Sequence, residues 1–195
     1  VVSILRFVSV DATSTVLVVY KPKDMRVDLV YQRALEHLNS VSTLTPLRSL
    51  SIYCGDDYGF MEHVQHRLCE GDDQLDRFYR NAGRLTAVLH LLGCTDCHYE
   101  NLIACGDQLL LIDTETLLDA DLLDHVADAS DQQTALAESD LDKRFFNSVL
   151  RSGLLPFWIF GGKNKVAFDI SALGIAPPVN PLTKGPGWLG LNSDG

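Results

Sequence analysis

Three polar residues in the middle of the chain have the types and the spacing of a metal-assisted phosphoryl-transfer site. Asp96 and Asn101 lie five positions apart, and Asp113 follows twelve residues later, at the end of an apolar run. A carboxylate such as Asp96 can orient or deprotonate a substrate hydroxyl. The oxygens of Asn101 and Asp113 are hard donors of the kind that Mg²⁺ prefers. The same spacing also arises by chance, so the other parts of such a site must be sought along the chain.

A lysine and a glutamate near the N-terminus are candidates for the nucleotide-binding part of a kinase-type site. Lys21 ends the β-branched run 16–20, a layout in which a lysine ammonium pairs with nucleotide phosphates. Glu36, on a predicted helix, is the candidate carboxylate partner of Lys21; the alternative is a surface glutamate on a polar face. A glycine-rich phosphate lid is missing before Lys21, because the first glycine of the sequence is Gly55.

The elements that must position these residues follow from hydrophobic periodicity. Alternating and β-branched runs predict strands, and apolar residues at i, i+3 and i+4 predict two amphipathic helices. Gly93 is expected to end the second helix with a positive φ, so that the loop bearing Asp96 follows a buried helix directly. The expected elements in chain order are strands at 3–10 and 15–20, a helix at 27–39, strands at 50–53 and 58–64, a helix at 71–92 and a strand at 109–112.

This element order predicts an α/β (α+β) chain with two parts. Residues 1–65 form a β-rich part with one helix, and residues 66–195 carry the Asp96 loop and the metal-binding residues. The acidic segment 117–142 is expected to be a mobile or solvated loop, and residues 151–156 are expected to form another loop. From about residue 176 onward, proline and glycine dominate and predict an irregular tail.

The composition restricts the function classes. A formal net charge of −10 argues against a nucleic-acid partner. No apolar run is as long as the roughly 18 residues that a membrane span needs. The five cysteines are odd in number and follow no signal peptide, so they are predicted to be reduced and the protein cytoplasmic. Cys94-x-x-Cys97 invites a zinc or redox interpretation, but no second Cys or His pair lies at finger spacing.

Five stretches, in order over most of the chain, resemble the dehydratase domain of type 2 lanthionine synthetases, which modify ribosomally made lantibiotic-type peptides. The Asp96-Cys97-His98-Tyr99-Glu100-Asn101 run is the most specific of the motifs that carry this resemblance. The five stretches are 19–23, 91–104, 111–117, 148–156 and 169–174.

The resemblance implies a two-lobed, kinase-like fold similar to that of lipid kinases, without an ordinary glycine-rich lid. It also implies ATP- and Mg²⁺-dependent phosphorylation of Ser and Thr in a precursor peptide with a leader, followed by elimination of the phosphate. From its position alone, His98 fits either a structural or a catalytic role, and the resemblance assigns it a catalytic one. The residues matched to the phosphorylation step are Lys21, Asp96, His98, Asn101 and Asp113.

The elimination machinery matches the family less well. Residues 188–194 resemble the Trp-x-Asn-x-Asn-Thr-Asp motif of the family, with Ser193 in place of Thr and Gly190 in place of the first Asn. Gly187 stands where an arginine would bind the leaving phosphate, and glycine cannot supply a guanidinium group. Ser193 is therefore the remaining catalytic candidate for this step.

Both ends of the sequence are interpreted as cut from a longer protein. The Gly-Asp-x-His stretch of the family would precede Val1, and a C-terminal cyclase domain with a zinc site would follow Gly195. Two alternatives to a dehydratase remain open: a peptide Ser/Thr kinase without elimination, and an inactive remnant that binds peptide.

Overall fold

The computed structural model describes residues 1–118, 144–145, 147–156, 158–160, 167–169 and 171–174. Most of the acidic segment 117–142, the tail from 176, Gly187 and Ser193 lie outside these residues. The chain divides into two compact units. One comprises Val1–Val88 and Leu102–Leu117, and the other comprises Leu89–Asn101 and the residues from Leu118 onward. Residues after position 65 occur in both units. The division expected at residue 65 stays a prediction.

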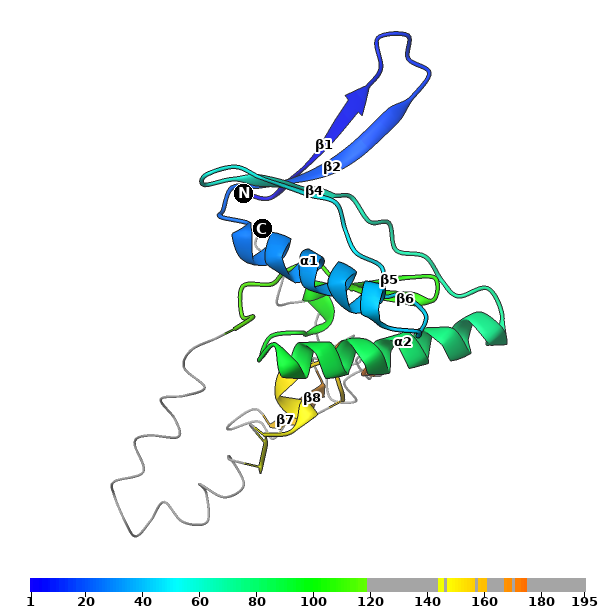
Figure 1. Cartoon of the computed structure of the whole chain (residues 1–195), viewed down its shortest axis with the longest axis vertical. Helices are drawn as coiled ribbons and strands as arrows, with labels where there is room; N and C mark the ends of the chain where they lie inside the picture. The colour runs from blue at the N-terminus through cyan, green and yellow to red at the C-terminus, as the bar shows by residue number, and fades with distance from the viewer. Residues whose placement is uncertain (119–143, 146, 157, 161–166, 170, 175–195) are drawn as a thin grey trace. The chain divides into compact units, whose positions relative to one another are not determined.

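The first unit contains a four-stranded antiparallel sheet with the strand order β1-β2-β4-β3 (Figure 1). The expected hairpin at 3–10 and 15–20 is confirmed, and so are the two short strands that follow the first helix. Only the second half of β2, from Val18 to Lys21, pairs with β4; its first half pairs with β1 alone. The strands are β1 (Ser3–Val8), β2 (Thr15–Lys21), β3 (Ile52–Cys54) and β4 (Gly59–Glu62).

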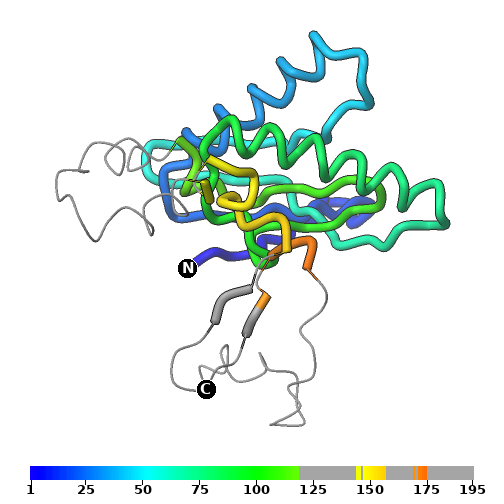
Figure 2. The backbone as a smooth tube through the Cα atoms, turned by 90° about the horizontal axis from the view of Figure 1, so that it is seen from below, coloured from blue at the N-terminus to red at the C-terminus, as the bar shows by residue number. Residues whose placement is uncertain are grey.

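Both predicted helices are confirmed as α1 (Arg26–Val41) and α2 (Asp72–Leu91). Two further strands, β5 (Leu102–Cys105) and β6 (Gln108–Leu111), form a hairpin whose turn places Gly106 at φ 60°. In Figure 2, α2 runs alongside this hairpin, whereas α1 diverges from it toward its C-terminal end. Side chains of α1, α2 and β6 meet around one small internal cavity, which is lined among others by Tyr31, Leu35, Leu85, Leu109 and Leu111.

The core of the first unit joins the sheet to the β5–β6 hairpin. Met25, the residue before α1, is fully buried and packs with Met61 of β4 and with Cys105 and Leu110 of the hairpin. Burial of these apolar groups stabilises the contact of the sheet and of the residue that precedes α1 with the β5–β6 hairpin. Lys21 at the end of β2 and Asp113 just after β6 are therefore held by the same core.

The second unit is built around the loop between α2 and β5. The 3₁₀ turns η1 (Tyr99–Asn101) and η2 (Val149–Ser152) accompany a small hairpin of β7 (Trp158–Phe160) and β8 (Ala167–Asp169). The segment expected as a loop at 151–156 thus begins inside a 3₁₀ turn, which Gly153 ends at φ 75°. Among the described residues, none of the helices combines the length and apolarity of a membrane span.

Gly59 is the position at which packing most directly excludes a side chain. A Cβ there would lie 2.5 Å from the sulfur of Met25 and 2.7 Å from the carbonyl oxygen of Tyr53. We therefore expect Gly59→Ala to lower the free energy of unfolding by about 2 kcal/mol, because β4 and α1 must move apart. Chemical denaturation followed by circular dichroism measures this change.

Gly83 on α2 provides the matched control, since no atom lies within 4 Å of its added Cβ. Gly83→Ala is expected to raise the free energy of unfolding by up to about 1 kcal/mol, through the better helix propensity of alanine. Equal effects of the two substitutions would contradict the packing argument.

Candidate active site

The loop that carries Asp96 is attached to its surroundings by backbone hydrogen bonds on both sides of Asp96. Gly93 ends α2 at φ 70°, and the Cys94 amide donates to the Leu89 carbonyl at 2.9 Å. The Cys97 amide donates to the Ser152 carbonyl at 2.7 Å, which ties the loop to η2. The positive φ predicted for Gly93 is thus confirmed, and the loop is fixed by backbone contacts on both sides of Asp96.

A disulfide between Cys94 and Cys97 closes this loop. Both half-cystines are buried, and their bond spans the residue pair 95–96. The prediction that all cysteines are reduced is therefore wrong for this pair. The spacing of three residues was visible in the sequence, but the choice between a thiol pair and a disulfide depends on how the loop folds. Cys54, Cys69 and Cys105 carry free thiols.

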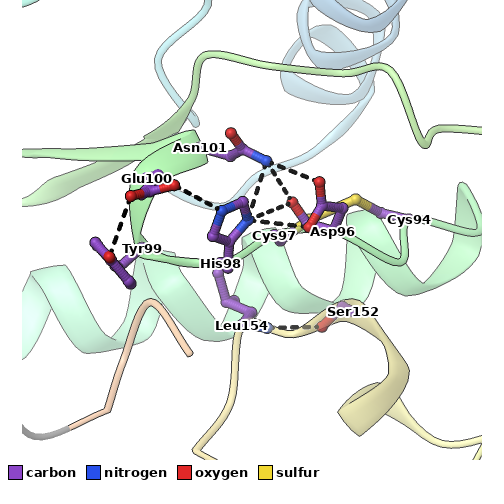
Figure 3. A network of polar contacts seen from close by, with 9 residues as sticks. All are labelled: Cys94, Asp96, Cys97, His98, Tyr99, Glu100, Asn101, Ser152 and Leu154. Carbon is purple, nitrogen blue, oxygen red and sulfur yellow. Dashed lines mark hydrogen bonds and ion pairs between the residues drawn. A yellow bond between two sulfur atoms is a disulfide. The ribbon is translucent and has the colours of Figure 1, made fainter. Parts of the chain in front are cut away.

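Asp96, His98 and Asn101 form one polar network (Figure 3). One carboxylate oxygen of Asp96 lies 3.0 Å from Nδ1 of His98, and the other accepts from the Asn101 amide at 3.2 Å. The Asn101 amide also donates to the main-chain oxygen of Asp96 at 2.8 Å. Asp96 nevertheless keeps 53 % of its side chain exposed, so its carboxylate is held in place and still open to a substrate.

Glu100 extends this network, and the sequence had given it no role. Its carboxylate lies 3.3 Å from Nε2 of His98 and accepts a hydrogen bond from the Tyr99 hydroxyl at 3.1 Å. Each ring nitrogen of His98 thus faces a carboxylate, Asp96 on one side and Glu100 on the other. The signal was present in the sequence as a second acid two residues after the histidine.

The amide of Asn101 is used on one side only. Its NH₂ group is directed toward Asp96 and His98, whereas its oxygen points away from both in Figure 3. In the described part of the chain, this oxygen accepts no hydrogen bond. The contacts of the NH₂ group therefore fix the orientation of the Asn101 side chain, and its oxygen fits the role of a cation ligand.

Lys21 is a buried cation of the first unit. Its ammonium donates to the carbonyl of Ile112 and lies 3.8 Å from the carboxylate of Asp28, which is 2 % exposed. Burial lowers the pKa of Lys21, against the negative charge of Asp28. Burial likewise raises the pKa of Asp28, against the positive charges of Lys21 and Lys23.

The expected pairing of Lys21 with Glu36 is wrong. Glu36 lies on the exposed face of α1, two turns beyond Asp28, and Asp28 takes its place as the partner of the lysine. The helical position was misjudged because the sequence gives the phase of a helix but not which turn faces a neighbouring strand. A short acid in the first turn, next to the end of β2, was the available signal.

A second lysine binds the carboxylate that was predicted to hold the metal. The Lys23 ammonium lies 2.7 Å from Oδ1 of Asp113 and 2.8 Å from Oε1 of Glu115. Burial alone would lower the pKa of Lys23, but the hydrogen bonds to these two carboxylates outweigh it and raise the pKa. Neither Lys23 nor Glu115 was singled out from the sequence, although both lie two residues from a candidate.

The structure thus brings the candidates together in two groups. Asp96, His98 and Asn101 meet in the second unit, while Lys21 and Asp113 belong to the first, where the Lys21 ammonium binds the carbonyl just before Asp113. The two residues predicted to bind the metal, Asn101 and Asp113, belong to different units. Ser193, predicted for elimination, lies outside the described residues.

The donor atoms fit a divalent cation of the magnesium type. In the first unit, Asp113 offers a partly exposed carboxylate; in the second, Asn101 offers an amide oxygen that accepts no hydrogen bond from the described residues, and each is a hard ligand taken by itself. Within the described residues, no group of three or more His, Cys, Asp or Glu side chains is arranged to hold a metal ion. A cation held by few protein ligands and completed by phosphate oxygens is the usual magnesium arrangement.

These features define a mixed α/β protein with an acid–histidine–amide loop in one unit and a lysine–carboxylate cluster in the other. The chain belongs to the family described as a domain of unknown function, DUF4135, which is found in LanM-type lantibiotic synthetases and whose model matches residues 2–195. The resemblance to type 2 lanthionine synthetases is thereby confirmed.

A curated relative is the lacticin 481/lactococcin biosynthesis protein LcnDR2 of Lactococcus lactis subsp. lactis. It is 26 % identical to this chain in an alignment 156 positions long, and the alignment covers 74 % of the chain and 16 % of the relative. The matched part of the chain therefore corresponds to a small share of the length of that protein.

The buried pair of Lys21 and Asp28 predicts a large effect on stability. Asp28→Ala is expected to lower the free energy of unfolding by about 3 kcal/mol, because it leaves a buried ammonium without its counter-charge. Glu36→Ala, on the exposed face of the same helix, is expected to change it by less than about 0.5 kcal/mol. Urea denaturation of the two variants measures both values, and a larger loss for Glu36→Ala would restore the original pairing.

The disulfide predicts a definite pattern of thiol reactivity. Alkylation of the unfolded protein without reductant is expected to label three cysteines (Cys54, Cys69 and Cys105), and all five after reduction. Peptide mass spectrometry identifies the labelled positions. Labelling of Cys94 and Cys97 before reduction would show that the loop is closed by packing alone.

Proposed function

We propose that this chain catalyses ATP- and Mg²⁺-dependent phosphorylation of Ser and Thr side chains in a ribosomally made precursor peptide, followed by elimination of the phosphate, in lantibiotic biosynthesis. The observation that carries the proposal is the Asp96 carboxylate, which is held by His98 and Asn101 and is still half exposed. Membership of a family found in lantibiotic synthetases, and a relative described as a lacticin 481/lactococcin biosynthesis protein, support the choice of a peptide substrate.

In the phosphorylation step, Asp96 positions the Ser or Thr hydroxyl and accepts its proton. The hydroxyl oxygen forms a bond to the γ-phosphorus of ATP while the bond from that phosphorus to the bridging oxygen breaks, which releases ADP. His98 and Asn101 keep the Asp96 carboxylate in one orientation by contacts at 3.0 and 3.2 Å. Proton transfer to a positioned side chain of this kind contributes a factor of about 10²–10⁴ in rate.

The residues of this chain proposed as ligands of the cation are the two predicted from the sequence, Asp113 and Asn101. A bound Mg²⁺ supplies neutralisation of the charge on the phosphate oxygens. Lys21 fixes the segment just before Asp113 through the Ile112 carbonyl, and this contact supports a positioning role for its ammonium. A direct contact of Lys21 with nucleotide phosphate stays a prediction.

The elimination step completes the proposed dehydration. A base removes the α-proton of the phosphorylated residue, the bond between Cβ and the phosphate oxygen breaks, and a Cα–Cβ double bond forms as phosphate leaves. Ser193 is the candidate residue of this chain for that step. A leader segment on the precursor peptide, a cytoplasmic location and a zinc-dependent cyclase domain in the full protein are parts of the same proposal.

Mass spectrometry of a Ser/Thr-rich precursor peptide, incubated with the purified chain, ATP and Mg²⁺, tests the proposal. We expect the peptide to lose one water per modified residue. Asp96→Asn is expected to lower the rate at least about 100-fold, because the proton acceptor is removed, and the exposed variant Glu36→Gln is expected to leave it unchanged.

The mass of the product separates the alternatives. A peptide that gains phosphate but never loses water would identify a peptide kinase without elimination, which the substitution of Gly187 for an arginine favours. A folded sample that forms no ADP would contradict both enzymatic functions and leave peptide binding as the remaining role.

A further inference from the structure

Lys23, Asp113 and Glu115 form the lysine–carboxylate cluster of the first unit, and the Lys23 ammonium is its positive charge. Lys23 places its ammonium between Asp113 and Glu115, at 2.7 and 2.8 Å from their oxygens. About a quarter of the Lys23 side chain is exposed, as are about a third of Asp113 and two-thirds of Glu115. The cluster is therefore within reach of solvent ions, unlike the buried pair formed by Lys21 and Asp28.

The neighbouring lysine cannot take over this role. The Lys21 ammonium is directed to the Ile112 carbonyl and to Asp28, both of which need it as a buried partner. Lys23, by contrast, contacts the partly exposed carboxylates of Asp113 and Glu115. Of the two cations next to Asp113, Lys23 is thus the one that can move at low cost.

We propose that Lys23 is a built-in competitor for the metal site: it holds Asp113 and Glu115 when no nucleotide is bound and weakens the binding of a free divalent cation. The inference deepens the proposed function, because it takes Asp113 as a ligand of the cation that accompanies ATP. When a polyphosphate arrives with the cation, the carboxylates turn to the cation and the ammonium gains phosphate oxygens as new partners. Lys23 is then a positioning residue for the carboxylates and a contact for the phosphate.

This arrangement makes the binding of cation and nucleotide interdependent. A free cation must displace the Lys23 ammonium, and the Coulomb repulsion between two positive charges at about 4 Å is stronger beside partly buried carboxylates than in bulk water. A nucleotide removes that obstacle by giving the ammonium another anion. By thermodynamic linkage, each ligand strengthens the binding of the other by the same factor.

Removing the Lys23 charge is expected to have opposite effects on the two ligands. In Lys23→Met, the affinity for Mn²⁺ alone should rise roughly tenfold, because the competing ammonium is gone. The affinity for ATP in the presence of Mg²⁺ should fall, because a phosphate partner is lost. Electron paramagnetic resonance of free Mn²⁺ measures the first affinity, and calorimetric titration measures the second.

Two variants serve as matched controls. Lys23→Arg keeps the charge and should bind Mn²⁺ as the original chain does. Arg26→Met removes one positive charge from an exposed side chain that pairs with Asp24, and it should leave Mn²⁺ binding unchanged.

Asp113→Asn should weaken Mn²⁺ binding in the presence or absence of Lys23, since it removes the carboxylate itself.

Each outcome decides the proposal. Unchanged or weaker Mn²⁺ binding by folded Lys23→Met would overturn it, as would retained Mn²⁺ affinity in Asp113→Asn or equal tightening in Arg26→Met. Lys23→Gln, with a polar side chain, repeats the measurement if the methionine variant does not fold. Tighter Mn²⁺ binding with no peptide phosphorylation by any variant would support the competition and contradict the proposed function, so the two can fail separately.

Discussion

The buried ammonium of Lys21 is the interaction on which the arrangement of the first unit depends. A lysine removed from water is costly unless it is paired and hydrogen-bonded, and here Asp28 and the Ile112 carbonyl supply both. The lysine and its two partners come from three separate segments: the end of β2, the first turn of α1 and the chain just after β6. One charge therefore fixes the geometry of the segment that continues into Asp113.

The second unit reaches its geometry by other means. Its loop is held by the Ser152 carbonyl and closed by the bond between Cys94 and Cys97, so Asp96 is oriented by backbone and covalent constraints. Hydrogen bonds from Asn101 then leave little freedom to the carboxylate itself. The Asp96 carboxylate is exposed to solvent and still fixed in orientation, because residues of its own loop hold it.

Sequence reasoning predicted the elements and the local part of the site, and it failed where distant segments meet. The helices and hairpins follow from periodicity, and Asp96, His98 and Asn101 lie within six residues, so their contact is a property of one loop. The partner of Lys21 depends on how the start of α1 lies against the end of β2, and Met25, the residue before α1, packs in the same core as Val19 of β2. The same holds for Lys23, whose partners lie 90 and 92 positions away.

The uneven pairing of β2 has a consequence for motion. Its first half is paired only with β1, and its second half lies between β1 and β4 and ends at Lys21. Local opening of a structure is cheapest where few neighbours are lost. Amide hydrogens should thus exchange fastest at the outer end of the β1–β2 hairpin and progressively more slowly toward Lys21, so that the outer end fluctuates while the buried lysine keeps its place.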